Sequence, residues 1–224
     1  MTHQPGGPRT RHLFPLIRQL SARTTPILLK TPLSANQITF ISMFLGLAAA
    51  GLFAAGEFRL SLLGGLVFFL SYLLDHCDGE VARAKNQASR FGQAFDSFVD
   101  WIVHAAFFAG VGWGAAENSG QLIWFWFGLA AGLGATINYL MGLYAFLTQA
   151  SDDGGGDPDN YDQPANWKEV LIFAFRELAR ADFWLLVLIL IIFDVLWLLL
   201  PAAAIGAQVY WILYLFAWNK NYRV

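Results

Sequence analysis

Four aspartates gather in one short stretch of an otherwise apolar chain, and their spacing is the first feature that could do chemistry. Asp75 and Asp78 are three residues apart, and Asp96 and Asp100 are four apart. Residues three or four apart on a helix share a face, with Cβ atoms about 5 to 6 Å from each other. Two neighbouring helices would therefore place the carboxylates around one point. Ligand sets made only of oxygen favour Mg²⁺ or Mn²⁺ over zinc, and four carboxylates suit two ions about 3.5 to 4 Å apart.

An arginine and two glycines accompany these carboxylates. Arg83 lies about two helical turns beyond Asp75, where a guanidinium can hold a phosphate through two parallel hydrogen bonds. Gly79 and Gly92 leave room for a ligand to approach the backbone. Carboxylates, paired metal ions, an arginine and a glycine gap together indicate phosphoryl chemistry.

The elements that must position these residues belong to a membrane protein. The chain of 224 residues is 57% hydrophobic and only 13% charged, against roughly 25% charged residues in soluble domains. Uncharged apolar runs predict an all-α, polytopic fold with six transmembrane helices, the last two divided at Pro201. The runs cover residues 38–56, 60–74, 101–116, 121–150, 183–192 and 195–219.

The second and third runs are too short to cross a bilayer unless the charged residues beside them continue the helices. Residues 60–74 and 101–116 both fall short of the roughly 20 residues that a span needs. We therefore expect helix two to run on to Lys85 and helix three to begin near Gly92. An ion at membrane depth costs about 2.5 to 3.5 kcal/mol, so four unpaired carboxylates would cost on the order of 10 kcal/mol. The aspartates must line a wet cavity and hold cations.

The charge pattern predicts the organisation and orientation of the chain. Residues 1–33 form a cytosolic juxtamembrane segment whose Leu13, Phe14, Leu16, Ile17 and Leu20 recur at helical spacing, which predicts an amphipathic helix on the membrane surface. Residues 34–224 form the six-helix domain, with a cytosolic loop at about 149–182. If the N-terminus is cytosolic, every basic residue except one lies inside. Both termini and the carboxylates then face the cytosol, at the inner or plasma membrane if the source is bacterial.

The aspartate-rich stretch resembles the complete signature of the CDP-alcohol phosphotransferase (CDP-alcohol phosphatidyltransferase) family. Its fixed residues are Asp75, Asp78, Gly79, Ala82, Arg83, Gly92, Asp96 and Asp100, all at the family's spacing. A motif this long has a negligible risk of a chance match. The resemblance implies a Mg²⁺-dependent integral membrane transferase of phospholipid biosynthesis with two divalent cations as cofactors.

The resemblance also implies roles for individual residues. Asp75, Asp78 and Asp96 would ligate the metal ions, and Asp100 would lie near the second ion and act as the general base. The nucleotide would be contacted by Asp75, Gly79, Ala82, Arg83, Ser89 and the loop Ser34, Ala35, Asn36 and Gln37, where Ala35 replaces the family's usual proline. Asp100 would take a proton from an acceptor hydroxyl, whose oxygen attacks the β-phosphorus and expels CMP.

The sequence specifies the donor and the acceptor less closely than the metal site. CDP-diacylglycerol is the expected donor by family frequency, and another CDP-alcohol is the alternative. The acceptor is a hydroxyl compound, either a polyol phosphate held by Arg176 and Arg180 or another alcohol. The alternative interpretation of these two arginines is that they lie at lipid headgroups. A lipid bilayer is the expected environment, a homodimer is possible, and no nucleic-acid partner is expected.

Two other classes of function remain open on the residues alone. An intramembrane prenyltransferase also uses aspartates with Mg²⁺, but it would release pyrophosphate rather than CMP. A divalent-cation transporter could coordinate ions through helix carboxylates, but Arg83 in a cation site would oppose binding. Asp194 is an intramembrane carboxylate that could be functional or lie at the interface, and the acidic loop at 151–164 is expected to be solvated.

Overall fold

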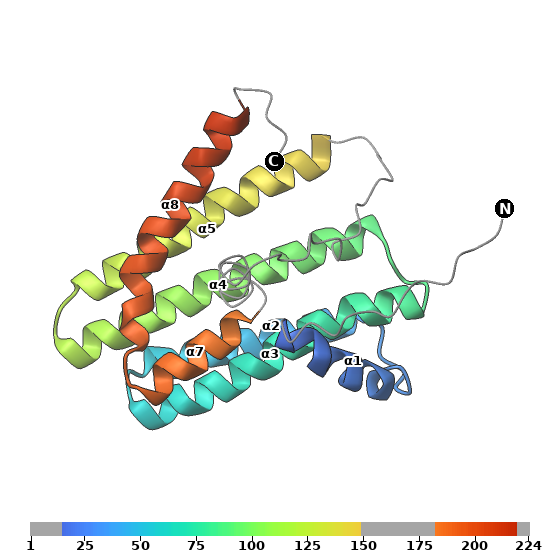
Figure 1. Cartoon of the computed structure of the whole chain (residues 1–224), viewed down its shortest axis with the longest axis horizontal. Coiled ribbons are helices and arrows are strands. Elements are labelled where there is room, and N and C mark those ends of the chain that lie inside the picture. The colour runs from blue at the N-terminus through green and yellow to red at the C-terminus, as the bar shows by residue number, and fades with distance from the viewer. Residues whose placement is uncertain (1–14, 149–181, 219–224) are drawn as a thin grey trace, which may run out of the picture.

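The fold is an antiparallel arrangement of helices, drawn in Figure 1. The structure, a computed structural model, describes residues 15–148 and 182–218, without the side chains of residues 210 and 213–218. The described part contains no strand, which confirms the all-α prediction. The elements are α1 (Leu16–Leu28), α2 (Ala35–Ala54), α3 (Phe58–Ala84), α4 (Arg90–Ser119), α5 (Ile123–Thr148), α7 (Phe183–Ile192), the 3₁₀ turn η1 (Leu196–Leu198) and α8 (Leu199–Trp218).

Four helices, α2 to α5, are long and apolar enough to cross a membrane. Two further apolar stretches in the described part, residues 183–192 and 196–209, are shorter than a span needs. The structure therefore shows four long membrane helices, and the count of six spans stays a prediction.

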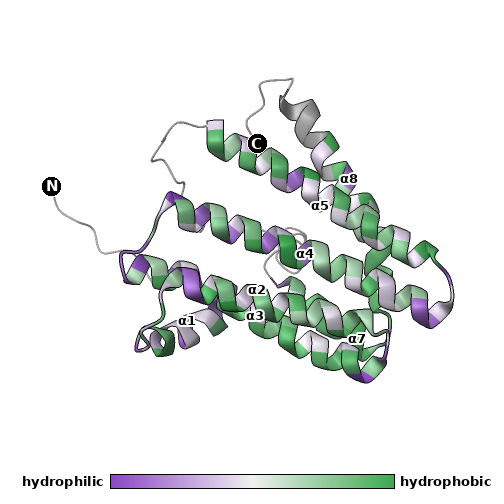
Figure 2. Ribbon diagram, turned by 180° about the vertical axis from the view of Figure 1, so that it is seen from behind, coloured by the Kyte–Doolittle hydropathy of each residue, from purple (hydrophilic) through white to green (hydrophobic). Residues whose placement is uncertain are grey.

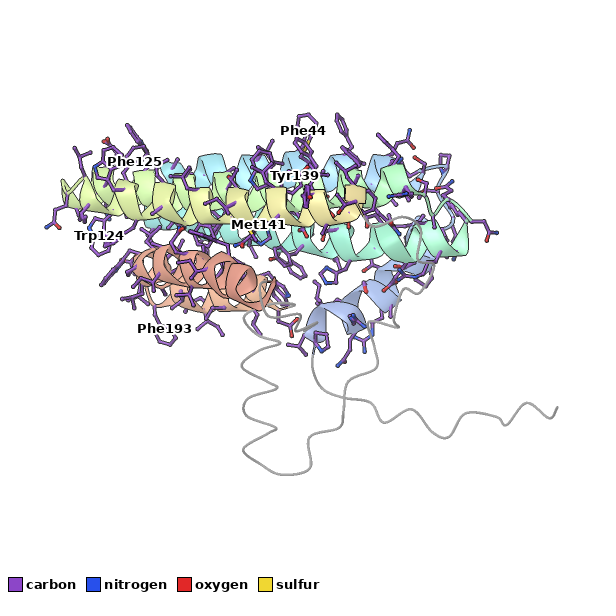
Figure 3. The ribbon with its side chains drawn as sticks, turned by 90° about the horizontal axis from the view of Figure 1, so that it is seen from above. Phe44, Trp124, Phe125, Tyr139, Met141 and Phe193 are labelled. Atoms are coloured by element: carbon purple, nitrogen blue, oxygen red, sulfur yellow. The ribbon has the colours of Figure 1, made fainter. Side chains whose placement is uncertain are left out.

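The break in the last apolar region was predicted at the wrong residue. Pro201 lies in the first turn of α8, where a missing backbone N–H removes no helical hydrogen bond. The chain instead turns at residues 193–195, where Asp194 has a left-handed φ of 56°. Phe193 is 70% exposed there, and it projects from the end of α7 on the side opposite to Phe44 (Figure 3).

Both helices that carry the aspartates have the predicted length. The 27 residues of α3 and the 30 of α4 continue past the apolar runs and include the charged residues, as the hydrophilic bands in Figure 2 show where α3 ends and α4 begins. Between them, Asn86 adopts a positive φ of 54°. Ser89 then caps α4 by accepting a hydrogen bond from the Gly92 N–H at 3.0 Å. This short turn sets the two aspartate pairs on adjacent helices.

Glycines bring α2, α4 and α5 into close contact at the end away from the aspartates. A Cβ added at Gly110 would meet the Ala50 carbonyl oxygen, and one at Gly114 would meet that of Phe53. Gly128 of α5 likewise lies against the Phe108 carbonyl oxygen. Small residues at these contacts let the helix backbones approach closely, as is common between membrane helices.

A core of aromatic rings fills the space between α2, α3 and α4. Phe107 packs against Phe53 with ring centroids 5.3 Å apart and stacks on Phe68 at 4.8 Å. All three rings are at most 2% exposed. The part of α3 and α4 next to the aspartates is therefore packed around buried rings.

The helix α1 packs on α3 instead of leaving its whole apolar stripe to lipid. Ile17 is fully buried, and Leu16 and Leu20 pack against the same core. The side chain of Asp182 accepts hydrogen bonds from the backbone N–H groups of Leu16 and Ile17, at 2.7 and 2.9 Å. A carboxylate thus satisfies the free N–H groups at the start of α1. Leu13 and Phe14, also part of the predicted stripe, lie outside the described residues.

Candidate active site

Three of the predicted ligands converge between α3 and α4. Asp75, Asp78 and Asp96 each offer a carboxylate oxygen, and these oxygens lie within 4.8 Å of one another. Asp78 is 5% exposed and the other two are half-buried. Like charges this close and this poorly hydrated repel unless a cation lies between them. The donor set, made only of carboxylate oxygens, fits Mg²⁺ or Mn²⁺.

A threonine of α2 positions the most buried of these carboxylates. The Thr39 hydroxyl donates a hydrogen bond to Asp78 Oδ2 at 2.5 Å, and it also lies 3.1 Å from the Ala35 carbonyl oxygen. Such a partner fixes the orientation of a metal-binding group. Sequence reasoning did not single out Thr39, although a buried hydroxyl early in an apolar span is a usable signal.

Asp100 lies beside the three clustered aspartates, but it is not one of them. Its side chain is exposed. It lines a small cavity of about 10 Å³ together with Asp75, and it also lines a larger cavity between α4 and α5. Asp100 is thus placed next to the cluster and open to a second ligand, while its role as metal ligand and base stays a prediction.

The small cavity beside Asp75 and Asp100 is lined mostly by residues with polar side chains and has room for about one water molecule. His104 lies in its wall with both ring nitrogens engaged. Nδ1 donates to the Asp100 carbonyl oxygen at 2.8 Å, so Nε2 accepts from the Tyr72 hydroxyl at 2.8 Å. This arrangement fixes the orientation of the imidazole against the backbone of Asp100.

Two predicted phosphate-binding features also lie at the same end of the bundle. A Cβ added at Gly79 would lie 3.5 Å from Arg83 Nη1, so the exposed guanidinium folds back over that glycine. A Cβ at Gly92 would lie 3.3 Å from Asn36 Oδ1 and 3.2 Å from Ser89 Oγ. The glycines therefore keep space free next to polar groups of α2, α3 and α4.

The loop that begins α2 is held by its own hydrogen bonds. Ser34 and Gln37 form a reciprocal capping box, with Gln37 Oε1 accepting from the Ser34 N–H at 2.9 Å. The Ala35 N–H donates to Gln87 Oε1 at 2.9 Å. Ala82 packs against a small apolar cluster around Val81. Within the loop of residues 34–37, Asn36 has the side chain nearest Gly92.

The remaining residues singled out from the sequence lie away from the carboxylate cluster or outside the described residues. Arg176, Arg180 and the acidic loop at 151–164 lie outside the described residues. Asp194 is exposed in the turn after α7. Near that turn, Ile191 packs on Gly65, which precedes Asp75 by ten residues, or about 15 Å along α3. Asp194 is therefore remote from the carboxylate cluster.

Glu80 is a further acidic residue beside the cluster, and it belongs to the junction with α1. Its two carboxylate oxygens accept hydrogen bonds from the hydroxyls of Ser21 at 2.6 Å and Thr25 at 2.5 Å. Both hydroxyl-bearing residues are buried. Glu80 thus fixes α1 against the part of α3 that carries the metal-binding candidates.

Sequence comparison relates most of this chain to a known group. Residues 33–219 match the family model described as CDP-alcohol phosphatidyltransferase. A bifunctional IPC transferase and DIPP synthase of Rubrobacter xylanophilus is 41% identical over 91 residues, covering 41% of this chain and 20% of that protein. An archaetidylinositol phosphate synthase of Pyrococcus horikoshii is 30% identical over 102 residues, covering 45% and 52%. The matched region thus spans between a fifth and about half of these relatives.

A solved structure shares the arrangement of helices. The crystal structure of the Mycobacterium tuberculosis phosphatidylinositol phosphate synthase with CDP-DAG bound aligns with a TM-score of 0.56. The alignment covers 86% of this chain and 91% of that one, at 23% identity. Similarity at this level of identity establishes a shared fold.

Proposed function

Because this chain belongs to the CDP-alcohol phosphatidyltransferase family, we propose that it transfers the phospho-alcohol group of a CDP-alcohol to an acceptor hydroxyl and releases CMP. The observation that carries this proposal is the convergence of Asp75, Asp78 and Asp96 within 4.8 Å, beside Arg83. CDP-diacylglycerol is the proposed donor, which the CDP-DAG in the structurally similar synthase supports.

The three clustered aspartates would hold the divalent ions, and Thr39 would keep Asp78 in its orientation. Bound ions would neutralise the charge that develops on the diphosphate during transfer. Arg83 would pair with a phosphate, and the space at Gly79 and Gly92 would let the nucleotide approach the backbone.

Asp100 is the proposed general base, because it is exposed next to the cluster and lines a cavity large enough for an acceptor. Its carboxylate takes the proton of the acceptor hydroxyl. The acceptor oxygen forms a bond to the β-phosphorus, and the bond from that phosphorus to the oxygen shared with the α-phosphorus breaks. CMP leaves with the electron pair of that bond.

The test uses the full chain in detergent or nanodiscs, with CDP-diacylglycerol, Mg²⁺ and a set of alcohols. We expect CMP release together with a new phospholipid. Asp100→Asn should abolish turnover while the protein still binds CDP-diacylglycerol, because the amide cannot accept the proton as the carboxylate does. An active Asn variant would refute the base assignment. Pyrophosphate release from a prenyl diphosphate, or cation uptake without CMP release, would instead support the prenyltransferase or the transporter.

A further inference from the structure

The larger cavity beside Asp100 has the size of a site for a small molecule. It has a volume of about 600 Å³ and lies between α4 and α5, within the range of about 300 to 1,000 Å³ typical of ligand sites. Its wall is formed by residues of α4, including Gln93, Ser97, Asp100 and Trp101, and by residues of α5, including Asn138 and Tyr139.

The cavity exists because α4 and α5 separate along their length. At Gly128 the two backbones are in contact, since an added Cβ would meet the Phe108 carbonyl oxygen. At Gly132, one turn further, the nearest atom is the Ala105 carbonyl oxygen at 3.8 Å. At Gly142 no atom lies within 4 Å of an added Cβ. The same separation is visible between α4 and α5 in Figure 1.

Aromatic rings form one part of the wall. Trp101 and Tyr139 stack with centroids 5.0 Å apart and an interplanar angle of 14°, and Figure 3 shows Tyr139 on α5. The indole N–H donates to Thr136 Oγ1 at 3.0 Å, which fixes the Trp101 ring. Rigid rings of this kind bind the apolar faces of small ring compounds at little cost in conformational entropy.

The polar groups of the wall include acceptors that have no donor within the described part of the protein. The Trp101 N–H and both nitrogens of His104 are already bonded within the protein. Asn138 donates to the Ala207 carbonyl oxygen at 3.4 Å, which leaves its Oδ1 buried without a partner among the described residues. Asp100 adds carboxylate oxygens that only accept. Gln93, Ser97 and Tyr139 of the wall can donate as well as accept. Hydroxyl groups, which also do both, therefore suit this wall, whereas an ionised phosphate supplies no donor for Asp100 or Asn138.

The charge of the wall points in the same direction. Its described lining residues include one carboxylate, that of Asp100, and no lysine or arginine. Arg90, at the start of α4, is engaged with Phe146, with its guanidinium carbon 4.9 Å from the ring centroid and Nη2 donating to the carbonyl oxygen at 3.0 Å. By sequence, the next basic residue after Arg90 is Lys168. Within the described lining, an anionic ligand would therefore meet the Asp100 carboxylate without a lysine or arginine side chain to pair with.

We propose that this cavity binds the acceptor, and that the acceptor is an uncharged polyol with a ring, such as a cyclitol or sugar. The inference rests on the proposed transfer reaction and names its second substrate. The ring lies on the Trp101 and Tyr139 side, other hydroxyls meet the polar side chains of the wall, and one hydroxyl reaches Asp100. That hydroxyl gives its proton to the Asp100 carboxylate while its oxygen bonds to phosphorus.

The first test compares neutral alcohols with their phosphate esters. The full chain with CDP-diacylglycerol and Mg²⁺ receives myo-inositol or myo-inositol 1-phosphate, and glucose or glucose 6-phosphate, with CMP and the lipid product measured. We expect kcat/KM at least tenfold higher for the neutral member of a pair. A preference for the phosphate esters would overturn the acceptor inference and leave the proposed reaction standing. No CMP release with any acceptor would refute both.

The second test locates the acceptor. Gly142→Phe adds a ring from the cavity wall, and Gly51→Phe adds the same ring on α2, where an added Cβ also meets no atom within 4 Å. The Gly142 variant should raise the KM for the neutral acceptor at least tenfold and change the KM for CDP-diacylglycerol less than twofold. The Gly51 variant should change neither. If Gly142→Phe leaves the acceptor KM unchanged, or Arg176→Ala or Arg180→Ala raises it tenfold, the acceptor binds elsewhere.

Discussion

Replacing Thr39 by valine tests whether the buried hydrogen bond to Asp78 prepares the site for a metal ion. Valine keeps the branched shape of threonine but removes the hydroxyl that donates to Asp78 Oδ2 at 2.5 Å. Because Asp78 is 5% exposed, water cannot readily replace that donor. A hydrogen bond to a charged group contributes about 1.5 to 3 kcal/mol. Removal of a partner behind a metal ligand typically weakens metal affinity about 10- to 100-fold.

The assay is the Mg²⁺ dependence of CMP release at saturating CDP-diacylglycerol. We expect the half-saturating Mg²⁺ concentration of the Thr39→Val protein to rise about 10- to 100-fold, with most of kcat recovered at high Mg²⁺. Thr24→Val is the matched control, since the Thr24 hydroxyl bonds the Leu20 carbonyl oxygen of its own helix at 3.0 Å and no other group among the described residues. A Thr39→Val protein that folds and needs no more Mg²⁺ than the wild type would refute the reasoning.

Three further outcomes are expected. Chelation by EDTA should abolish CMP release and Mg²⁺ or Mn²⁺ should restore it, because the clustered carboxylates repel one another without a cation; activity that survives EDTA would contradict the metal site. Gly128→Val should lower the thermal unfolding temperature in detergent, because its side chain meets the Phe108 carbonyl oxygen, whereas Gly206→Val, with no atom within 4 Å of an added Cβ, should not. Asp182→Ala removes both hydrogen bonds at the start of α1. Because such a helix cap contributes about 1 to 2 kcal/mol, amide hydrogen exchange there should become about 5- to 30-fold faster. Unchanged exchange would show that packing alone holds α1.

Much of the metal site is predictable because it depends on short-range geometry. The spacing of Asp75 and Asp78 places them on one helical face whatever the rest of the fold does. The length that a bilayer demands extends α3 and α4 through their charged residues, and the structure confirms this extension. The approach of Asp96 then follows from a turn of a few residues between the two helices.

Other parts of the site depend on how distant segments pack, which local patterns do not specify. The Asp182 bonds to the start of α1 join residues 165 and 166 positions apart. The pairing of Glu80 with α1 needs that helix to be docked first. The cavity beside Asp100 arises from the angle between α4 and α5. The helix break predicted at Pro201 lies instead in the turn at residues 193–195, because proline is compatible with the first turn of a helix.

The helix α5 packs on α4 and α8 and contains no acidic residue. It therefore contributes nothing to the carboxylate cluster, yet it forms about half of the wall facing Asp100. If this cavity holds the acceptor as we propose, substitutions in α5 would exchange the alcohol that is accepted and leave the phosphorus chemistry on α3 and α4 intact. Acceptor binding and phosphoryl transfer on separate helices would give a lipid synthase a simple route to new headgroups. The segment to redesign first is then α5.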